Sequence, residues 1–156
     1  TRPGLWPAFW TLGITGPWPH GGEIDIMEYY RGTLLANVAW GGAKPFQAIW
    51  ADTRKPLDSF NDAKWSAAFH VWRMDWDERA IVLSVDGTKL NEVELTRTVN
   101  QDGTGRNPFH EPQYVLLNLA IGGTAGGDPS GTEFPARFDV DFVRVYQRES
   151  KSPVRN

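Results

Sequence analysis

Three carboxylate side chains lie close together in the apolar stretch 22–28, which reads GEIDIME. In a regular β-strand successive side chains point to opposite faces, so Glu23 and Asp25 would share one face and Glu28 would point to the other. A β-bulge near Ile26-Met27 would insert one residue and return Glu28 to the acidic face. Without it, either Glu28 or the Glu23/Asp25 pair would be buried in the core at a large desolvation cost. The sequence therefore predicts a bulged strand with all three carboxylates on one face.

Carboxylates placed this close repel each other, so their pKa values must separate. Glycoside hydrolysis needs such a separation, because an ionised carboxylate attacks the anomeric carbon while a protonated one donates to the leaving oxygen. A retaining pair lies roughly 5–5.5 Å apart and an inverting pair roughly 6.5–9.5 Å apart, and sequence spacing does not choose between them. The residues alone also leave open a solvated acidic strand face or a calcium site with oxygen ligands.

Aromatic and amide side chains supply candidate sugar contacts on neighbouring strands. Trp6 and Trp10 share one face of a predicted strand over 5–11, roughly 13 Å apart, which suits stacking along an extended ligand. A place in the core is the alternative for both tryptophans. In the predicted strand 114–121, Asn118 lies opposite a fully aliphatic face, which indicates a second face outside the core.

Composition excludes several function classes. The chain has 156 residues, the size of one domain, and a net charge of -3 with 22% charged residues, which is unlike a nucleic-acid-binding footprint. It contains no cysteine, so thiol catalysis, thiolate metal sites and disulfides are excluded. No run of eighteen apolar residues occurs, so we expect no membrane-spanning helix. The 8 tryptophans, 16 glycines and 11 prolines favour a β protein with aromatic surfaces.

Short apolar runs separated by Gly, Pro, Asp and Asn predict an all-β chain, either a sandwich or a jelly roll. The predicted strands cover 5–11, 23–28, 34–40, 69–76, 80–86, 89–94, 114–121 and 138–147, with a hairpin turn at Asp86-Gly87. A short helical turn is expected within 58–67, and long loops are expected at 41–57, 97–112 and 122–135. The polar end, 149–156, is expected to fray.

The stretch EIDIME matches the E-x-D-x-x-E signature of glycoside hydrolase family 16. Four further segments resemble that family in the right order: GLWPAFWTLG at 4–13, FHVWRMDW at 69–76, LNLAIGG at 117–123 and VDFVRVY at 140–146. The resemblance implies an all-β jelly roll of two curved antiparallel sheets with a concave sugar cleft, and retaining hydrolysis through a covalent glycosyl-enzyme. Residues 1–148 would form a partial catalytic domain, followed by the polar tail.

The resemblance also implies residue roles. Glu23 matches the nucleophile, Glu28 the general acid/base, and Asp25 the residue that tunes the proton of the nucleophile. No cofactor would be required for catalysis, although Asp141 matches a position where many members bind a structural calcium. The residues that match sugar-contacting positions are Trp6, Trp10, His70, Trp72 and Asn118.

Two departures from the family pattern bear on function. Members carry several strands before the segment at 4–13, so this chain would expose apolar edges unless an N-terminal segment or a second chain completed the sandwich. The residues that follow the catalytic strand lack the His-Gly pair of many laminarinase-like members. A β-1,3- or β-1,3/1,4-glucan is the first expectation for the substrate.

Alternatives of other kinds remain open at this point. One is a galactanase acting on agar, porphyran or carrageenan, for which loop cations such as Lys44 and Arg106 would bind sulfate. Others are a non-catalytic carbohydrate-binding module and a calcium-dependent lectin. An enzyme that acts on polymers too large to enter cells is expected to be secreted or periplasmic, and no nucleic-acid or membrane partner is expected.

Overall fold

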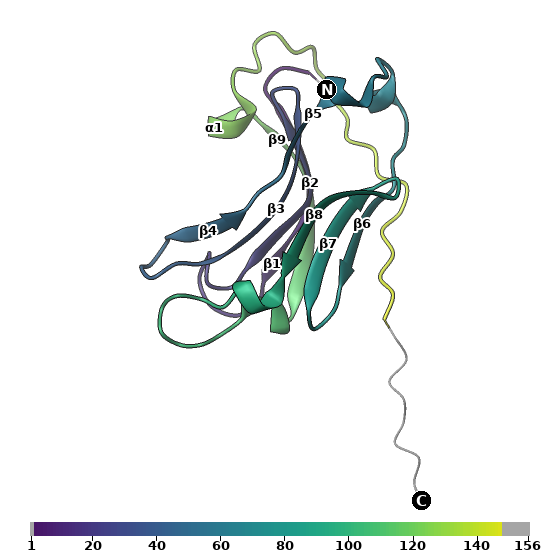
Figure 1. The fold of residues 1–156 in the computed structure, drawn as a ribbon. Helices are drawn as coiled ribbons and strands as arrows, with labels where there is room; N and C mark the ends of the chain where they lie inside the picture. Colours follow the sequence, from purple (N-terminus) through teal and green to yellow (C-terminus); the bar gives the residue numbers. More distant parts are fainter. Residues whose placement is uncertain (1, 148–156) are drawn as a thin grey trace, which may run out of the picture.

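The computed structural model describes residues 2–147 and shows two antiparallel β-sheets packed face to face (Figure 1). The larger sheet has the order β4-β3-β2-β1-β9, with β5 also paired to β3, and the smaller has the order β6-β7-β8. The larger sheet contains β1 (Leu5–Gly13), β2 (Glu23–Tyr30), β3 (Thr33–Gly41), β4 (Ala48–Ala51), β5 (Arg54–Pro56) and β9 (Gln113–Ile121). The smaller sheet contains β6 (Trp72–Trp76), β7 (Ala80–Val85) and β8 (Thr88–Glu94). The predicted all-β sandwich is confirmed.

The core lies between the smaller sheet and the strands β2 and β3. Alternation along these two strands directs the side chains of Ile24, Ile26 and Val38 inward, where they pack with Ile81 and Leu83 of β7. The remaining core residues include Ala36, Trp40, Val93, Leu95 and Phe109. Because β2 buries its isoleucines on this side, its opposite face is left for the carboxylates.

Turn chemistry at Asp86-Gly87 produces the predicted hairpin between β7 and β8. Both residues have positive φ, 49° and 78°, which is the backbone of a tight two-residue turn that matches strand twist. The expected helical turn within 58–67 is present as two 3-10 helices, η1 (Leu57–Phe60) and η2 (Trp65–Ala67). The other short helices are η3 (Leu95–Arg97), η4 (Pro108–His110) and α1 (Gly123–Gly126).

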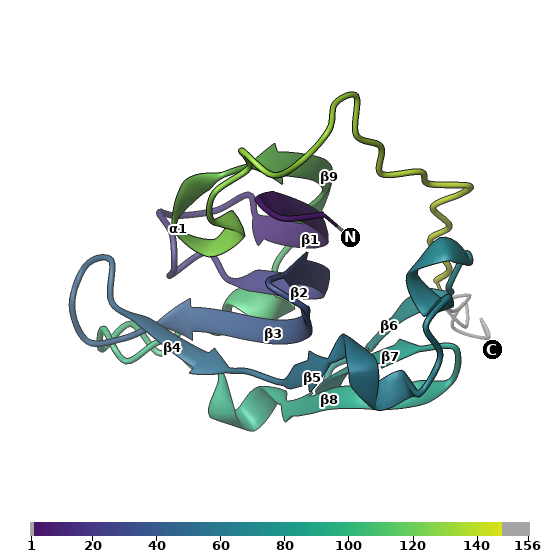
Figure 2. The same ribbon diagram turned by 90° about the horizontal axis from the view of Figure 1, so that it is seen from above.

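Two predictions about strands are wrong. The expected loop 41–57 contains β4 and β5, which have only four and three residues and depend on pairing with β3. The expected strand 138–147 is absent, although its apolar and polar residues alternate. A strand needs a hydrogen-bonding neighbour, and no described strand pairs with these residues. The segment instead runs along the β6 side of the molecule (Figures 1 and 2).

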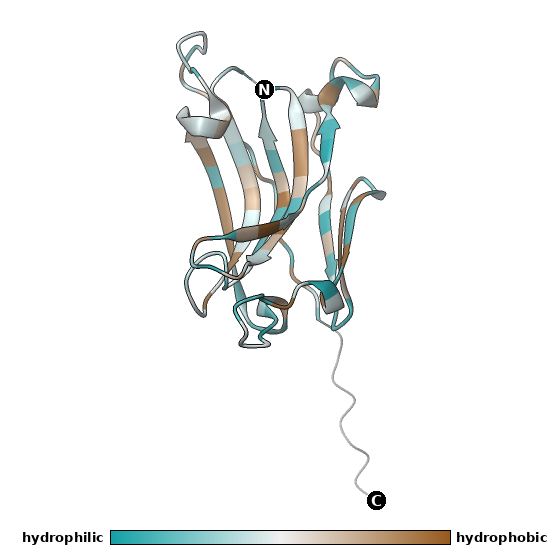
Figure 3. Cartoon of the chain, turned by 60° about the vertical axis from the view of Figure 1, so that its left-hand side comes forward, coloured by the Kyte–Doolittle hydropathy of each residue, from teal (hydrophilic) through white to brown (hydrophobic). Residues whose placement is uncertain are grey.

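The smaller sheet covers only part of the inner face of the larger sheet. The smaller sheet lies against β2 and β3, and the outer strand β9 extends past it (Figure 2). Hydrophobic positions run along the strands of both sheets (Figure 3), yet Val115, Leu117 and Ile121 of β9 remain 43–57% exposed. We call these three residues the open apolar face. Among residues 2–147, no helix is long and apolar enough to span a bilayer.

Candidate active site

The predicted β-bulge is present in β2 and places the three carboxylates. Trp10 of β1 lies opposite Asp25 and the preceding Phe9 lies opposite Met27, so one residue of β2 is extra between them. The register with β3 shifts over the same interval, between Asp25 and Glu28. The inserted residue resets the alternation, so Glu28 returns to the face of Glu23 and Asp25.

Glu23 and Glu28 line the same cavity, which has a volume of about 290 Å³. Trp6 and Trp10 of β1 and Asn118 of β9 also line it, as the face assignments from the sequence predicted. The full lining is Trp6, Ala8, Trp10, Leu12, Trp18, Glu23, Glu28, Asn118 and Ala120. The lining thus combines two carboxylates with three indole rings, an arrangement suited to a sugar chain.

Each of the two cavity carboxylates accepts a hydrogen bond from an indole N–H. Trp6 Nε1 donates to Glu28 Oε1 at 2.7 Å, and Trp18 Nε1 donates to Glu23 Oε2. The third tryptophan, Trp10, donates instead to Asn118 Oδ1 at 2.7 Å. Sequence reasoning missed Trp18. Its only signal was its place in the loop that leads directly into the acidic strand.

Asp25 lies beneath the cavity and is 1% exposed. Burial raises its pKa to about 10, and the charges on Glu28 and Glu23 and hydrogen bonding with both act in the same direction. Its Oδ2 has no hydrogen-bond partner among the described residues. A proton on Asp25 therefore removes a buried charge and supplies a donor for the neighbouring carboxylates.

Burial also raises the pKa values of Glu23 and Glu28, and the indole hydrogen bonds oppose this increase. For Glu23, hydrogen bonds from Trp18 and with Asp25 lower the pKa against the effect of burial. For Glu28, the charge on Glu23 adds to burial, while hydrogen bonds from Trp6 and with Asp25 lower the pKa. The repulsion between the two glutamates favours one ionised and one protonated group, the state that glycoside hydrolysis requires.

The sequence model described as "Glycosyl hydrolases family 16" matches residues 1–144. The chain belongs to this family. It is 34% identical over 162 residues to the glucan endo-1,3-beta-glucosidase A1 of Niallia circulans, covering 96% of this chain and 23% of that protein. It is 31% identical to the beta-glucanase of Rhodothermus marinus, covering 92% of this chain and 52% of that protein.

A solved relative has a similar fold. The laminarinase catalytic domain from Thermotoga maritima MSB8 superposes with a TM-score of 0.67 at 29% identity, and the match covers 86% of this chain and 55% of that one. The chain thus spans 55% of the length of this solved relative, and 23% and 52% of the lengths of the two curated ones.

His70 and Trp72, which the family resemblance implied as sugar contacts, do not line the cavity. His70 stacks on Trp65 at 3.6 Å between ring centroids, and its Nδ1 lies 2.6 Å from Asp86 Oδ2. Trp72 packs against the hydrophobic core. The physical reason is that β6 belongs to the smaller sheet, while the carboxylates lie on the outer face of the larger one.

Asp141 lies in the segment 138–147, which has no secondary structure. Among residues 2–147 there is no group of three His, Cys, Asp or Glu side chains that could hold a metal ion. That finding concerns side-chain clusters alone, so a structural calcium at Asp141 stays a prediction. The tail 149–156, expected to fray, lies outside the described residues.

Proposed function

We propose that this protein is an endo-acting retaining hydrolase of β-1,3- or β-1,3/1,4-glucan, with Glu23 as nucleophile and Glu28 as general acid/base. The observation that carries the proposal is the bulge in β2, which brings both carboxylates into one tryptophan-lined cavity. The glucanase names of the family 16 relatives support the choice of substrate.

The reaction proceeds in two balanced steps. The Glu23 carboxylate attacks the anomeric carbon while Glu28 gives its proton to the leaving glycosidic oxygen, so the ester bond to Glu23 forms as the glycosidic bond breaks. Glu28, now ionised, removes a proton from water, which attacks the anomeric carbon and releases Glu23. The proton on Asp25 stabilises the Glu23 carboxylate each time that charge returns.

The test is a panel of laminarin, mixed-linkage glucan, agarose, porphyran and carrageenan, with products separated by size and the anomer of the first product read by NMR. We expect internal cleavage of a β-glucan with retention of configuration, and loss of turnover in Glu23→Gln. Turnover that persists in Glu23→Gln would refute the nucleophile, and an inverted product would refute the retaining mechanism.

Galactan hydrolysis is the second candidate, because one relative is the keratan-sulfate endo-1,4-beta-galactosidase of Sphingobacterium multivorum, 28% identical over 92% of this chain. Sulfated substrates favour cationic sites, and no Lys or Arg is among the described residues that line the catalytic cavity. A glucan therefore fits this cavity better than a sulfated galactan. A binding module without activity is disfavoured because all three carboxylates are present.

We also propose that further β structure, from a preceding segment or a second chain, covers the open apolar face. The exposed aliphatic side chains of β9 and the unpaired segment 138–147 both support this proposal. Because a glucan polymer cannot enter a cell, we place the working protein outside the cytoplasm. Activity recovered in the culture medium or periplasm would support that location, and activity confined to the cytoplasm would contradict it.

A further inference from the structure

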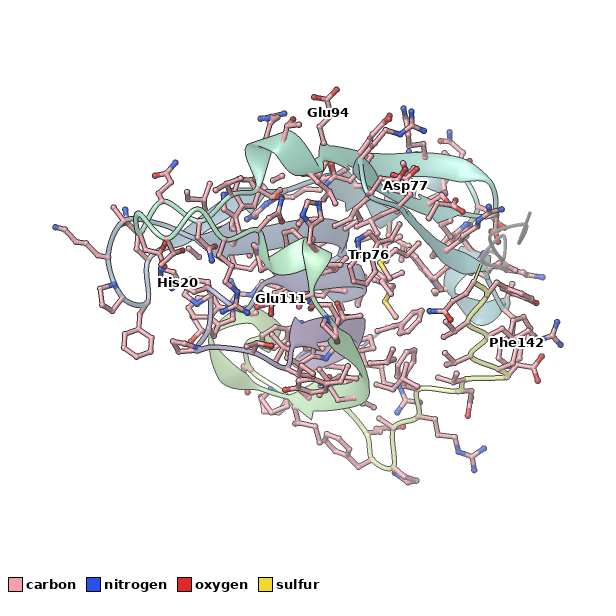
Figure 4. All side chains as sticks on the ribbon, turned by 90° about the horizontal axis from the view of Figure 1, so that it is seen from below. His20, Trp76, Asp77, Glu94, Glu111 and Phe142 are labelled. Atoms are coloured by element: carbon pink, nitrogen blue, oxygen red, sulfur yellow. The ribbon has the colours of Figure 1, made fainter. Side chains whose placement is uncertain are left out.

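The loop 14–22, which joins β1 to β2 and carries Trp18, is held by side chains from one distant segment of the chain. Three residues of the segment 100–113 donate hydrogen bonds to backbone carbonyls of this loop. The bonds run from Asn100 Nδ2 to the carbonyl of His20 at 2.9 Å, from Arg106 Nη2 to that of Thr15 at 2.9 Å, and from Gln113 Nε2 to that of Gly21 at 3.1 Å. Figure 4 shows His20 and Glu111, one from each stretch, on the side of the molecule away from Phe142.

Asn100 is the buried member of these three donors, and it joins the loop to β3. It is 4% exposed, whereas Arg106 and Gln113 are half-buried. While its Nδ2 donates to His20, its Oδ1 accepts a hydrogen bond from Gly41 N at 2.8 Å, at the end of β3. A Cβ at Gly41 would come within 2.3 Å of the His20 ring, so only glycine allows this close packing. Asn100 therefore fixes the loop against β3, the strand beside β2.

The position of this loop matters because it places Trp18 on Glu23. Trp18 lies two residues before His20, and its indole Nε1 donates to Glu23 Oε2. Since Trp18 is 41% exposed, side-chain packing holds its ring only in part and the loop backbone must do the rest. Burial raises the pKa of Glu23, and the hydrogen bond from Trp18 opposes that increase. A residue that fixes the carbonyl of His20 therefore also fixes the donor to Glu23.

Replacing Asn100 by alanine changes no charge near the site. The titratable groups next to the loop or to Glu23 are His20, Asp102, Arg106, Glu111, Asp25 and Glu28. All six remain in an Asn100→Ala variant. A change in the titration of Glu23 in that variant would therefore report a change in the position of its hydrogen-bond donor.

We propose that Asn100 is a positioning residue, which fixes the carbonyl of His20 and so holds Trp18 where its indole donates to Glu23. Asn100 is not among the described residues that line the catalytic cavity, so it acts on the site only through the loop. The inference rests on the proposed function and deepens it, because it makes the segment 100–113 responsible for keeping the nucleophile ionised.

The test measures kcat/KM on laminarin across the pH range for Asn100→Ala in the full protein. Because the loosened donor no longer stabilises the ionised Glu23, the acidic limb should move upward by about half a pH unit, less than complete loss of the hydrogen bond would give. The double variant Asn100→Ala/Trp18→Phe should match Trp18→Phe alone, since the donor is already absent. Asn100→Ser, whose hydroxyl is too short to reach His20 but leaves a polar group beside Gly41, should shift the limb as Asn100→Ala does.

Asn91→Ala is the matched control. Asn91 Nδ2 also bridges backbone segments, donating to the carbonyls of Ala36 at 2.8 Å and Ala51 at 2.9 Å, but it does not touch the loop 14–22. Its loss should lower stability and leave both limbs in place. An unmoved acidic limb in the Asn100 variants, an equal shift in Asn91→Ala, or a shift that adds to that of Trp18→Phe would overturn the proposal.

A second measurement does not depend on turnover. The Glu23 carboxyl, followed by carbon-13 NMR in protein labelled at glutamate, should titrate at higher pH in Asn100→Ala than in the wild type. A wild-type protein that cleaves no glucan would refute the proposed function, whereas an unchanged titration of Glu23 would refute the role of Asn100, so the two failures are distinguishable.

Discussion

Replacing the two indole donors separately should move opposite limbs of the pH profile of kcat/KM. Trp18 donates to the proposed nucleophile Glu23, and Trp6 donates to the proposed acid Glu28. Phenylalanine keeps a ring in each place but removes the N–H, so Trp18→Phe and Trp6→Phe each withdraw one hydrogen bond from a carboxylate. Since that bond stabilises the ionised form, the pKa of the carboxylate rises in both variants.

The size of the shift follows from the strength of the hydrogen bond. A hydrogen bond to a charged group is worth about 1.5–3 kcal/mol, and one pKa unit corresponds to about 1.4 kcal/mol. Trp18 is 41% exposed, so water partly replaces its donor and a shift of about one unit is expected. Because Glu23 must be ionised, Trp18→Phe moves the acidic limb upward. Because Glu28 must be protonated, Trp6→Phe moves the basic limb upward.

The assay is kcat/KM on laminarin across the pH range, fitted to two apparent pKa values of the coupled pair. Trp10→Phe is the control, because Trp10 lines the same cavity but donates to Asn118 rather than to a carboxylate. It should weaken binding without moving either limb. If Trp10→Phe shifts a limb as much as the others, or if Trp6→Phe and Trp18→Phe move the same limb, the division of roles is refuted.

Three further predictions follow from the same geometry. Glu28→Gln should lower kcat/KM on glucan about 10²- to 10⁴-fold, and the loss of kcat/KM should be smaller on an aryl glycoside, whose leaving group needs no proton. Initial rates measure both values, and equal losses on the two substrates would exclude Glu28 as the acid. Asp25 keeps its proton to about pH 10 when folded but loses it near pH 3.9 when unfolded, so stability falls as the pH rises between these values. Asp25→Asn should therefore be less active yet up to about 4 kcal/mol more stable at pH 7 by denaturant unfolding, and a variant less stable than wild type would contradict the raised pKa. The chain expressed alone should bind a hydrophobic dye at the open apolar face, and replacing Leu117 by Thr should reduce the dye binding. A monomer with full activity and a cooperative melt would show that this face needs no cover.

Local pattern was enough to predict the parts of the site that depend on alternation. A regular strand would bury either Glu28 or the other two carboxylates, and this cost predicted the bulge. The alternation of side chains along a strand predicted the face on which Trp6 and Asn118 lie. Alternation could not show which sheet a strand joins, so His70 and Trp72 were assigned to the wrong place. Trp18 was missed because a loop residue reaches Glu23 through chain reversal, which leaves no periodic signal.

The segment 138–147 shows a different limit of the same reasoning. Its alternating pattern is typical of a strand with one buried face, yet Val140, Phe142 and Val143 are exposed. A segment forms a strand only when another strand pairs with it. The alternating pattern indicates that 138–147 can pair in this way, but it does not identify the partner strand. The exposed side chains of β9 give the same indication independently. Both features are explained if one additional β element covers the inner side of β9 and pairs with 138–147, leaving the cavity on the outer face of the larger sheet unaffected.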